Sequence, residues 1–232
     1  MVPENPNKEA ESPSGTLRIA VFDLDGTLLP GTSGELLLIR FLRRRSLLPI
    51  SNFIRGLVYL VRSLPENPRE AILRNKFYMF DLTPKTIGSI LADFYGESIR
   101  PRLSARMLDA MDDLKRLGFW IVLISGTLDF IVKDLVVRLG ADAGVGSTLE
   151  VHRGRYTGRL LGIHPYGTSK LKALKQILQD RVVDWSESYG FGDSRADIPL
   201  LSMFGHPKAV NPDRFLRRTA RQRGWEIIAD RS

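Results

Sequence analysis

The chain has 232 residues, of which 43% are hydrophobic and 26% are charged, an ordinary composition for a globular protein. It contains no cysteine, which excludes disulfide bonds, thiol catalysis and cysteine metal sites, and we expect a cytoplasmic location. A formal net charge of +8 attracts anions of many kinds, so nucleic acid, anionic lipid and phosphorylated metabolites are the classes of partner to weigh.

The N-terminal segment, residues 1–15, is rich in proline and glutamate and has no apolar core. It matches neither a secretory signal nor a membrane anchor, and we expect it to be disordered. The most apolar region, Leu36–Leu64, is interrupted by arginines and lacks the roughly 20 consecutive apolar residues that a membrane-spanning helix needs. We therefore expect no transmembrane segment, while peripheral contact with a membrane stays open.

Three short apolar runs predict buried strands: Leu17–Phe22, Phe119–Ile124 and Ser188–Phe191. Helical patterns separate these runs: Ala105–Leu117, Phe130–Leu139 and Ser169–Leu178. Strands that alternate with helices indicate an α/β fold with a Rossmann-like parallel sheet. Each predicted strand ends at a small or acidic polar cluster, and open parallel sheets bind their ligands at these carboxyl ends.

Two segments depart from this alternation. Leu36–Tyr95 is helical in pattern, is broken by four prolines, and lies between the first two strands, where it would form a lid above the strand ends. Residues 146–161 predict a β-hairpin with its turn at residues 153–154. The predicted division is a disordered segment, a catalytic core in two pieces and an inserted helical cap: residues 1–15, residues 16–30 with 101–232, and residues 31–100.

The first polar cluster is Asp23-Leu24-Asp25-Gly26-Thr27. Two carboxylates at one strand end are unfavourable unless a cation or a proton compensates them. Hard oxygen ligands favour Mg²⁺, which usually takes one or two carboxylates and keeps several waters. The motif therefore indicates a magnesium site, although acidic turns also occur by chance.

The second cluster, Ser125-Gly126, lies between a predicted strand and a predicted helix. A helix start offers unpaired N–H groups that favour a phosphate oxygen, but a hydroxyl residue there is also an ordinary helix cap. Lys170 opens a later helix and would neutralise a phosphoryl oxygen as a point charge, or be a surface residue.

The last cluster places Asp193 and Asp197 just after the third predicted strand. Asp193 would complete a metal site. Asp197 would orient the metal ligands by hydrogen bonds without binding the metal itself. Helix capping by aspartate would explain one of these acids but not both.

Taken together, the four clusters resemble the haloacid dehalogenase superfamily of phosphohydrolases, whose pattern appears here as Asp23-Leu-Asp25-Gly-Thr27, Ser125-Gly126, Lys170 and Gly192-Asp193-Ser-Arg-Ala-Asp197. The helical insert after the first motif resembles the cap of the phosphoserine-phosphatase-like branch, subfamily IB. The match extends from about Ile19 to Asp213, so the resemblance implies the fold and the chemistry of that superfamily over most of the chain.

The resemblance implies a magnesium-dependent phosphatase that forms an aspartyl phosphate. Asp23 would attack phosphorus, and Asp25 would protonate the leaving oxygen and then activate water. Asp23, Asp193 and Asp25, the last through its backbone carbonyl, would hold the metal.

The same resemblance implies a phosphate-binding group and a supporting group. Ser125, Gly126 and Lys170 would hold the phosphoryl oxygens. Thr27 and Asp197 would support the site without contacting the phosphate. A small-molecule phosphate ester is the expected partner, and nothing in the sequence indicates an oligomeric state.

The sequence indicates the substrate less clearly than the reaction. Phosphoserine phosphatases carry an acid soon after the first motif, whereas Thr32 stands at that position here and the first acid is Glu35, which counts against phosphoserine. The cap has large apolar residues, which we expect to pack mostly inward: Phe41, Phe53, Tyr59, Phe77, Tyr78 and Phe80. The substrate is thus a small phosphorylated metabolite or, if some of these side chains line the pocket beside Arg40 or Arg43, a lysophospholipid-type phosphate.

Other readings stay open at this point. A phosphoserine phosphatase stays an alternative, and so does an aspartyl-phosphate phosphotransferase, which would use the same residues with an alcohol as acceptor. A basic nucleic-acid or membrane-surface binding protein would explain the charge but not the four motifs, so no nucleic-acid partner is expected. The three scattered histidines are expected to be structural or exposed, and none receives a catalytic role.

Overall fold

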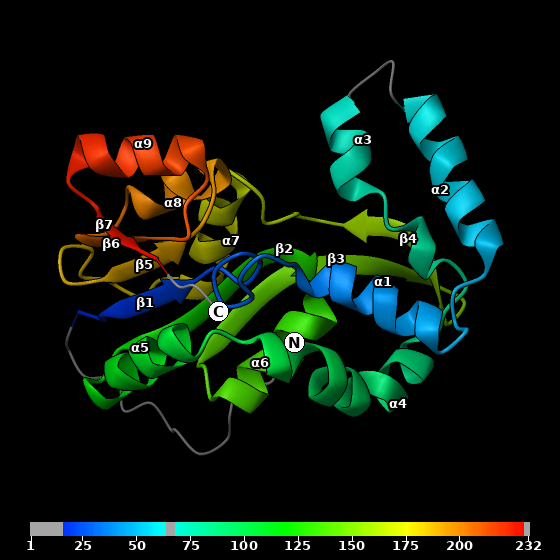
Figure 1. The fold of residues 1–232 in the computed structure, drawn as a ribbon, viewed down its shortest axis with the longest axis horizontal. Coiled ribbons are helices and arrows are strands. Elements are labelled where there is room, and N and C mark those ends of the chain that lie inside the picture. The colour runs from blue at the N-terminus through cyan, green and yellow to red at the C-terminus, as the bar shows by residue number, and fades with distance from the viewer. Residues whose placement is uncertain (1–15, 64–67, 230–232) are drawn as a thin grey trace.

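The computed structural model describes residues 16–63 and 68–229, so the predicted disorder of residues 1–15 lies outside the described residues. A seven-stranded sheet forms the centre in the order β4-β3-β2-β1-β5-β6-β7, and all neighbours are parallel except β3 and β4 (Figure 1). The strands are β1 (Ile19–Phe22), β2 (Trp120–Leu128), β3 (Ala143–His152), β4 (Arg155–Leu161), β5 (Tyr189–Gly192), β6 (His206–Val210) and β7 (Glu226–Ile228). The predicted α/β fold is confirmed.

Helices cover both faces of the sheet (Figure 1). Side chains alternate along β1: Ala20 and Phe22 join the apolar cluster that contains α5 and α6, whereas Ile19 and Val21 join the cluster that contains α7 and α8. This two-residue alternation shows that β1 is buried on both sides, as a central parallel strand must be. The covering helices are α5 (Ala105–Arg116), α6 (Asp129–Leu139), α7 (Ser169–Leu178), α8 (Ile198–Leu201) and α9 (Arg214–Arg223).

The insert between β1 and α5 is helical, as predicted, and extends beyond the carboxyl ends of the strands (Figure 1). Ser33 and Thr83 cap α1 and α4 by accepting a main-chain N–H three residues ahead. The N–H of Ser104 donates to the carbonyl of Leu28 at 3.0 Å, so the chain re-enters the core close to where it left. The elements are α1 (Gly34–Arg44), α2 (Ile50–Ser63), α3 (Pro68–Arg74), η1 (Phe77–Met79), α4 (Pro84–Phe94), η2 (Tyr95–Ile99) and η3 (Arg100–Arg102). The predicted limits of the cap stay a prediction.

The predicted hairpin is formed by β3 and β4, with its turn at residues 153–154. Its outer strand is joined to the insert by main-chain hydrogen bonds. The N–H of Lys76 donates to Gly158 at 3.2 Å, and the N–H of Asp81 donates to Tyr156 at 2.9 Å. The hairpin therefore connects the sheet to the helical insert.

Several C-terminal elements have no counterpart among the predictions. β6 begins with His206-Pro207 and contains Lys208, so it lacks the apolar run that marks a buried strand. β7 has only three residues. These strands are defined by pairing with their neighbours, which a local pattern does not contain.

The expectation that the large apolar residues of the cap pack inward is correct for part of the set. Phe41 and Tyr78 are buried, whereas Phe53 on α2 is exposed and corrects that expectation. The arginine run at residues 43–45 is exposed, as a solvated helix end should be.

Candidate active site

The site is built around a lysine between two buried carboxylates. Asp23 follows β1 directly, and its main-chain N–H donates to Phe191 of β5 at 3.0 Å. Lys170 lies in the first turn of α7, and its Nζ donates to Oδ1 of Asp23 at 2.6 Å. Both side chains are almost fully buried, so the strand end and the helix start are locked together by this ion pair.

The second carboxylate belongs to Asp197, whose Oδ1 accepts from Lys170 at 2.5 Å. Its Oδ2 accepts the N–H of Asp193 at 3.2 Å, and both the N–H and the hydroxyl of Ser194, at 3.1 and 3.0 Å. A Cβ on Gly192 would lie 2.7 Å from the Cβ of Asp197, so a glycine is needed at this close approach. Asp197 thus orients both the lysine and the turn that carries Asp193.

Three carboxylates meet in one place: oxygens of Asp23, Asp193 and Asp197 lie within 4.8 Å of one another. Burial raises the pKa of Asp23 well above its usual range, and the ion pair with Lys170 only partly opposes this. Burial, and then the charge of Asp197, raises the pKa of Asp193 to about 7. Lys170 responds in the opposite sense: burial alone would lower its pKa, but Asp197 and Asp23 raise it.

These residues fit a hard divalent cation. When all three carboxyl groups are ionised, as metal binding requires, one ammonium leaves two negative charges uncompensated, which matches the charge of Mg²⁺. Both oxygens of Asp197 already accept hydrogen bonds, so Asp23 and Asp193 are the better pair to hold the ion. Asp25 does not add its carboxylate to this group, and its predicted contribution through the backbone carbonyl stays a prediction.

The carboxyl group of Asp25 faces the insert and the second motif. Its Oδ1 accepts the N–H of Gly34, at the start of α1, at 2.8 Å, and its Oδ2 accepts the hydroxyl of Ser125 at 3.1 Å. Burial raises its pKa, while these two hydrogen bonds lower it in part. A carboxyl group with a raised pKa is suited to proton transfer.

Ser125 and Gly126 lie in a different local structure from the one predicted. We expected them at the start of a helix, but β2 continues to Leu128 and α6 begins at Asp129. The pairing of β2 with β3 shifts register between Ile124 and Leu128, so the strand runs on through an irregular stretch that carries the motif.

His164 is a residue that the sequence analysis missed. A Cβ on Gly126 would lie 3.1 Å from the ring carbon Cε1 of His164, so the ring packs against the second motif. The hydroxyl of Ser147 lies 2.7 Å from the Gly126 carbonyl and 2.6 Å from Nδ1 of His164. A hydroxyl has one proton, which Ser147 donates to the carbonyl, so Nδ1 carries the ring proton and Nε2 is an acceptor.

The imidazole of His164 is neutral over the physiological range. Burial lowers its pKa to about 4, and the positive charges of Lys76, Arg74 and Lys170 contribute in that order. No local pattern signalled this residue, because it lies in the segment between β4 and α7, beside Pro165, and reaches the site only in the folded chain.

Buried polar atoms without a hydrogen-bond partner concentrate at this site. Among the described residues they are Oγ1 of Thr27, Thr32 and Thr127 and Nε2 of His164. Thr27 and Thr32 flank the turn after β1, and Thr127 follows the second motif. Because buried polar groups are nearly always paired in folded proteins, these atoms mark the place where a polar ligand or water is accommodated.

A charged group from the insert lies beside the site. Glu35, in the first turn of α1, accepts from Nζ of Lys76 and from the hydroxyl of Tyr78, each at 2.8 Å. Its charge raises the pKa of Asp25, which shows that the two carboxyl groups are close. Its carboxylate is nevertheless already paired with a cation.

Residues 20–202 match the family of haloacid dehalogenase-like hydrolases, which is well over half of the chain. The chain belongs to this family. All eight predicted site residues lie around the carboxyl ends of β1, β2 and β5 or the start of α7.

Curated relatives of this hydrolase include phosphatases. A probable phosphatase and a phosphoserine phosphatase, both from Mycobacterium tuberculosis, are each 27% identical; both matches cover 94% of this chain, and they cover 79% and 73% of the relatives. A histidinol-phosphatase from Neisseria meningitidis is 26% identical over 90% of this chain and 97% of its own.

Solved structures agree with the fold. A protein of unknown function from Bordetella pertussis Tohama I has a TM-score of 0.78 at 27% identity, over 92% of this chain and 99% of its own. A phosphoserine phosphatase in apo form has a TM-score of 0.62 at 17% identity, over 93% and 94% of the two chains, which is a likeness of fold. The prediction of a phosphatase of the phosphoserine-phosphatase-like kind is confirmed.

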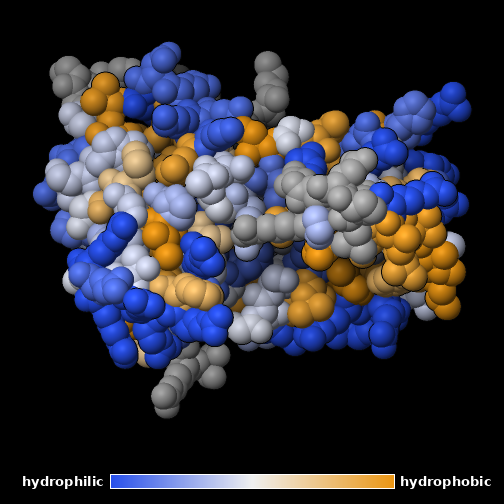
Figure 2. Space-filling view, turned by 90° about the horizontal axis from the view of Figure 1, so that it is seen from above, coloured by the Kyte–Doolittle hydropathy of each residue, from blue (hydrophilic) through white to orange (hydrophobic). Residues whose placement is uncertain are grey.

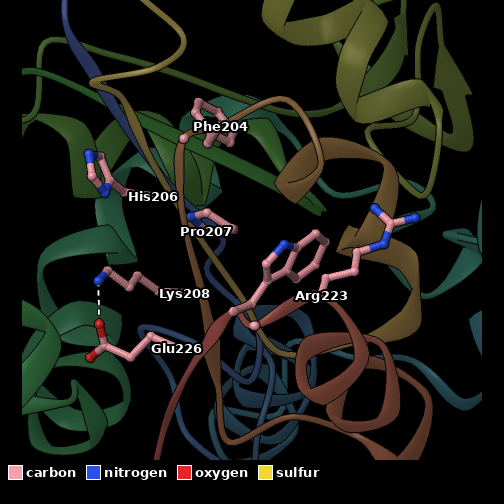
Figure 3. Close-up of a pocket in the computed structure, with 9 residues that line it drawn as sticks. Phe204, His206, Pro207, Lys208, Arg223 and Glu226 are labelled. Carbon is pink, nitrogen blue, oxygen red and sulfur yellow. Dashed lines mark hydrogen bonds and ion pairs between the residues drawn. The ribbon is translucent and has the colours of Figure 1, made fainter.

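A hollow elsewhere on this hydrolase does not take part in the site (Figure 3). It is lined by residues 204–208 and 223–226, at the amino end of β6, and Lys208 pairs with Glu226 across it. The acidic cluster lies at the opposite ends of the strands, so this hollow is separate from the chemistry.

No helix in the part of the chain that the structure describes is long and apolar enough to cross a membrane.

Proposed function

We propose that this chain is a magnesium-dependent phosphomonoester hydrolase that works through an aspartyl phosphate on Asp23. The observation that carries the proposal is the buried lysine that joins Asp23 to Asp197 inside a group of three carboxylates. Lys170 lies between Asp23 and Asp197, which come from opposite ends of the chain, and places a positive charge beside the proposed attacking group. Phosphoryl transfer requires such neutralisation of the negative charge on the phosphoryl oxygens.

The residues divide the reaction into two displacements. A carboxylate oxygen of Asp23 attacks phosphorus as the ester oxygen leaves, and Asp25 gives its proton to that oxygen. Asp25 then takes a proton from water, which attacks the phosphorus, releases inorganic phosphate and restores Asp23. Lys170, Ser125 and the main chain at Gly126 would hold the phosphoryl oxygens, and Mg²⁺ held by Asp23 and Asp193 would add positive charge where negative charge develops.

The neighbours of the catalytic residues favour a small, polar leaving group over a long acyl chain. His164 presents an acceptor atom, Thr32 a hydroxyl, and Lys76 and Glu35 lie nearby. An acyl chain would leave these buried polar groups without partners, which is costly. We infer a phosphorylated metabolite whose leaving group carries a hydroxyl that donates to His164.

Phosphoserine is disfavoured for a related reason. The position that would carry an acid is Thr32, and the nearby carboxylate of Glu35 already pairs with Lys76 at 2.8 Å. An ammonium group on the substrate would have to compete with that buried ion pair.

The test is a panel of phosphate monoesters assayed with Mg²⁺. We expect turnover of small polar esters, little turnover of a lysophosphatidate, and loss of activity by several orders of magnitude in Asp23→Asn. Asp109→Asn, at an exposed position of α5, is the matched control and should retain wild-type rates. Retained activity in Asp23→Asn would contradict the mechanism, and preference for the lysophosphatidate would contradict the substrate class. With glycerol present, inorganic phosphate rather than glycerol phosphate should be the main product of a hydrolase.

A further inference from the structure

Helix α2 presents its apolar side to solvent. Its large apolar residues are between 43% and 78% exposed: Ile50, Phe53, Ile54, Leu57, Val58 and Val61. Figure 2 shows the resulting hydrophobic patch at the end of the molecule that carries α2. An exposed patch of contiguous apolar side chains on a protein of this size marks an interaction surface.

The opposite side of α2 packs on the protein through Asn52, Gly56 and the ring of Tyr59, which lies 5.0 Å from the ring of Phe77. The Nδ2 of Asn52 donates to the carbonyls of Tyr78 and Phe80, at 3.2 and 2.7 Å. The carbonyl of Gly56 accepts from the side chain of Asn75 at 3.0 Å. Ordinary amphipathic helices bury their apolar side, whereas α2 leaves most of its large apolar residues in solvent, and these hydrogen bonds help to fix that orientation.

The charged residues of α2 itself are all positive. α2 contains Arg55 and Arg62, both exposed, and no aspartate or glutamate. Arg40 and Arg43 are exposed on α1, which ends at Arg44, shortly before α2 begins. An apolar helix face with arginines and no acids is the composition of helices that lie in the interface of an anionic bilayer.

We propose that the exposed face of α2 docks this hydrolase on an anionic lipid surface. Its apolar side chains would enter the boundary between headgroups and acyl chains, and its arginines would pair with lipid phosphates. A second copy of the chain is a poorer partner for this face, because two copies of α2 would bring arginines together without any acid of the helix to compensate them. The helix has 14 residues, so it lies on a membrane and does not span it.

The experiment is flotation of the full chain with two kinds of vesicle, phosphatidylcholine alone and phosphatidylcholine mixed with phosphatidylglycerol. We expect binding to the mixed vesicles and at least tenfold weaker binding to the neutral ones. The triple variant Ile54→Ser/Leu57→Ser/Val61→Ser should lose binding by tenfold or more. Arg55→Gln and Arg62→Gln should each weaken vesicle binding about fivefold, and this loss should be smaller at high salt.

The control variant is Val137→Ser, which changes an exposed apolar residue on α6 and should bind like the wild type. Hydrolysis of p-nitrophenyl phosphate in solution should be unchanged in all these variants, which shows that they fold. Absence of vesicle binding by the wild type, or equal binding to neutral vesicles, would overturn the proposal. A wild-type dimer in sedimentation that the triple variant converts to monomers would assign the face to a second copy instead.

Discussion

Lys170 is the residue on which the electrostatics of the site depend, because it is the ammonium that contacts both Asp23 and Asp197. Replacement by methionine keeps the volume but leaves two buried carboxylates without their cation. We expect Lys170→Met to lower the free energy of unfolding by about 3–5 kcal/mol, measured by urea denaturation without metal. Lys172→Met, at an exposed position of the same helix, should change it by less than about 0.5 kcal/mol. Equal stability of the two variants would mean that the ion pairs contribute little.

His164 gives the stability a pH dependence of known sign. Its pKa is about 4 in the folded chain, below the ordinary value of 6.5, because of burial and the charges of Lys76, Arg74 and Lys170. Between these values the unfolded chain holds a proton that the folded chain lacks. Stability should therefore fall as pH falls through this window, by roughly 1.4 kcal/mol per pH unit from this residue.

The variant His164→Asn isolates that contribution, because an asparagine amide keeps a donor for Ser147 but does not titrate. The difference in unfolding free energy between wild type and variant should shrink, or change sign, as pH falls from 6.5 toward about 4. Urea denaturation across this range measures it, and a difference that does not vary with pH would show that the ring is not held neutral.

At the scale of single residues, the sequence predicted that polar side chains would gather at the carboxyl ends of the strands, because the position of each cluster directly after an apolar run is a local pattern. It did not predict the contact of His164 with Gly126 or the ion pair of Glu35 with Lys76. Those contacts join segments far apart along the chain, and a single histidine or glutamate in a loop has no distinctive spacing.

Among the elements, the junction between β4 and the insert positions the cap over the site. Gly158 has φ +79°, and a Cβ there would lie 2.7 Å from the Cα of Phe77. Gly154 in the hairpin turn has φ +76° and open space around it. Gly154→Ala should cost roughly 1–2 kcal/mol from backbone strain alone, and Gly158→Ala a further roughly 1–3 kcal/mol from the steric clash.

Thermal or urea unfolding of these two variants measures the difference directly. Because the backbone strain is shared, the excess loss in Gly158→Ala reports the contact between β4 and η1. Equal losses would show that the insert yields at this contact and is not fixed by it.

The elements that were predicted well are those whose own pattern decides them. β1 has a continuous apolar run and α7 has an apolar stripe, and both pack into the core. β6 depends on its neighbours, and the orientation of α2 depends on two asparagines that hold its polar side. A hydrophobic stripe predicts that a helix is amphipathic, but it does not say which partner covers the stripe.

For the whole molecule, metal binding should couple to folding. The three carboxylates carry more negative charge than Lys170 compensates, so Mg²⁺ should stabilise the wild type, by about 2.7 kcal/mol at a hundredfold excess over Kd. Asp193→Asn should abolish that gain, yet be at least as stable as the wild type when metal is removed by a chelator. Thermal unfolding with and without Mg²⁺ measures both, and the same gain in the variant would exclude Asp193 as a ligand.

The central claim is that Asp23 carries the phosphoryl group during turnover. The most direct measurement is mass mapping of the variant Asp25→Asn, quenched in acid during reaction with p-nitrophenyl phosphate, whose leaving group needs no proton. Loss of Asp25 should slow hydrolysis of the intermediate, so we predict phosphate on the peptide that contains Asp23 and none when Asp23→Asn is added. Phosphate on a different residue, or full turnover by Asp23→Asn, would contradict the account.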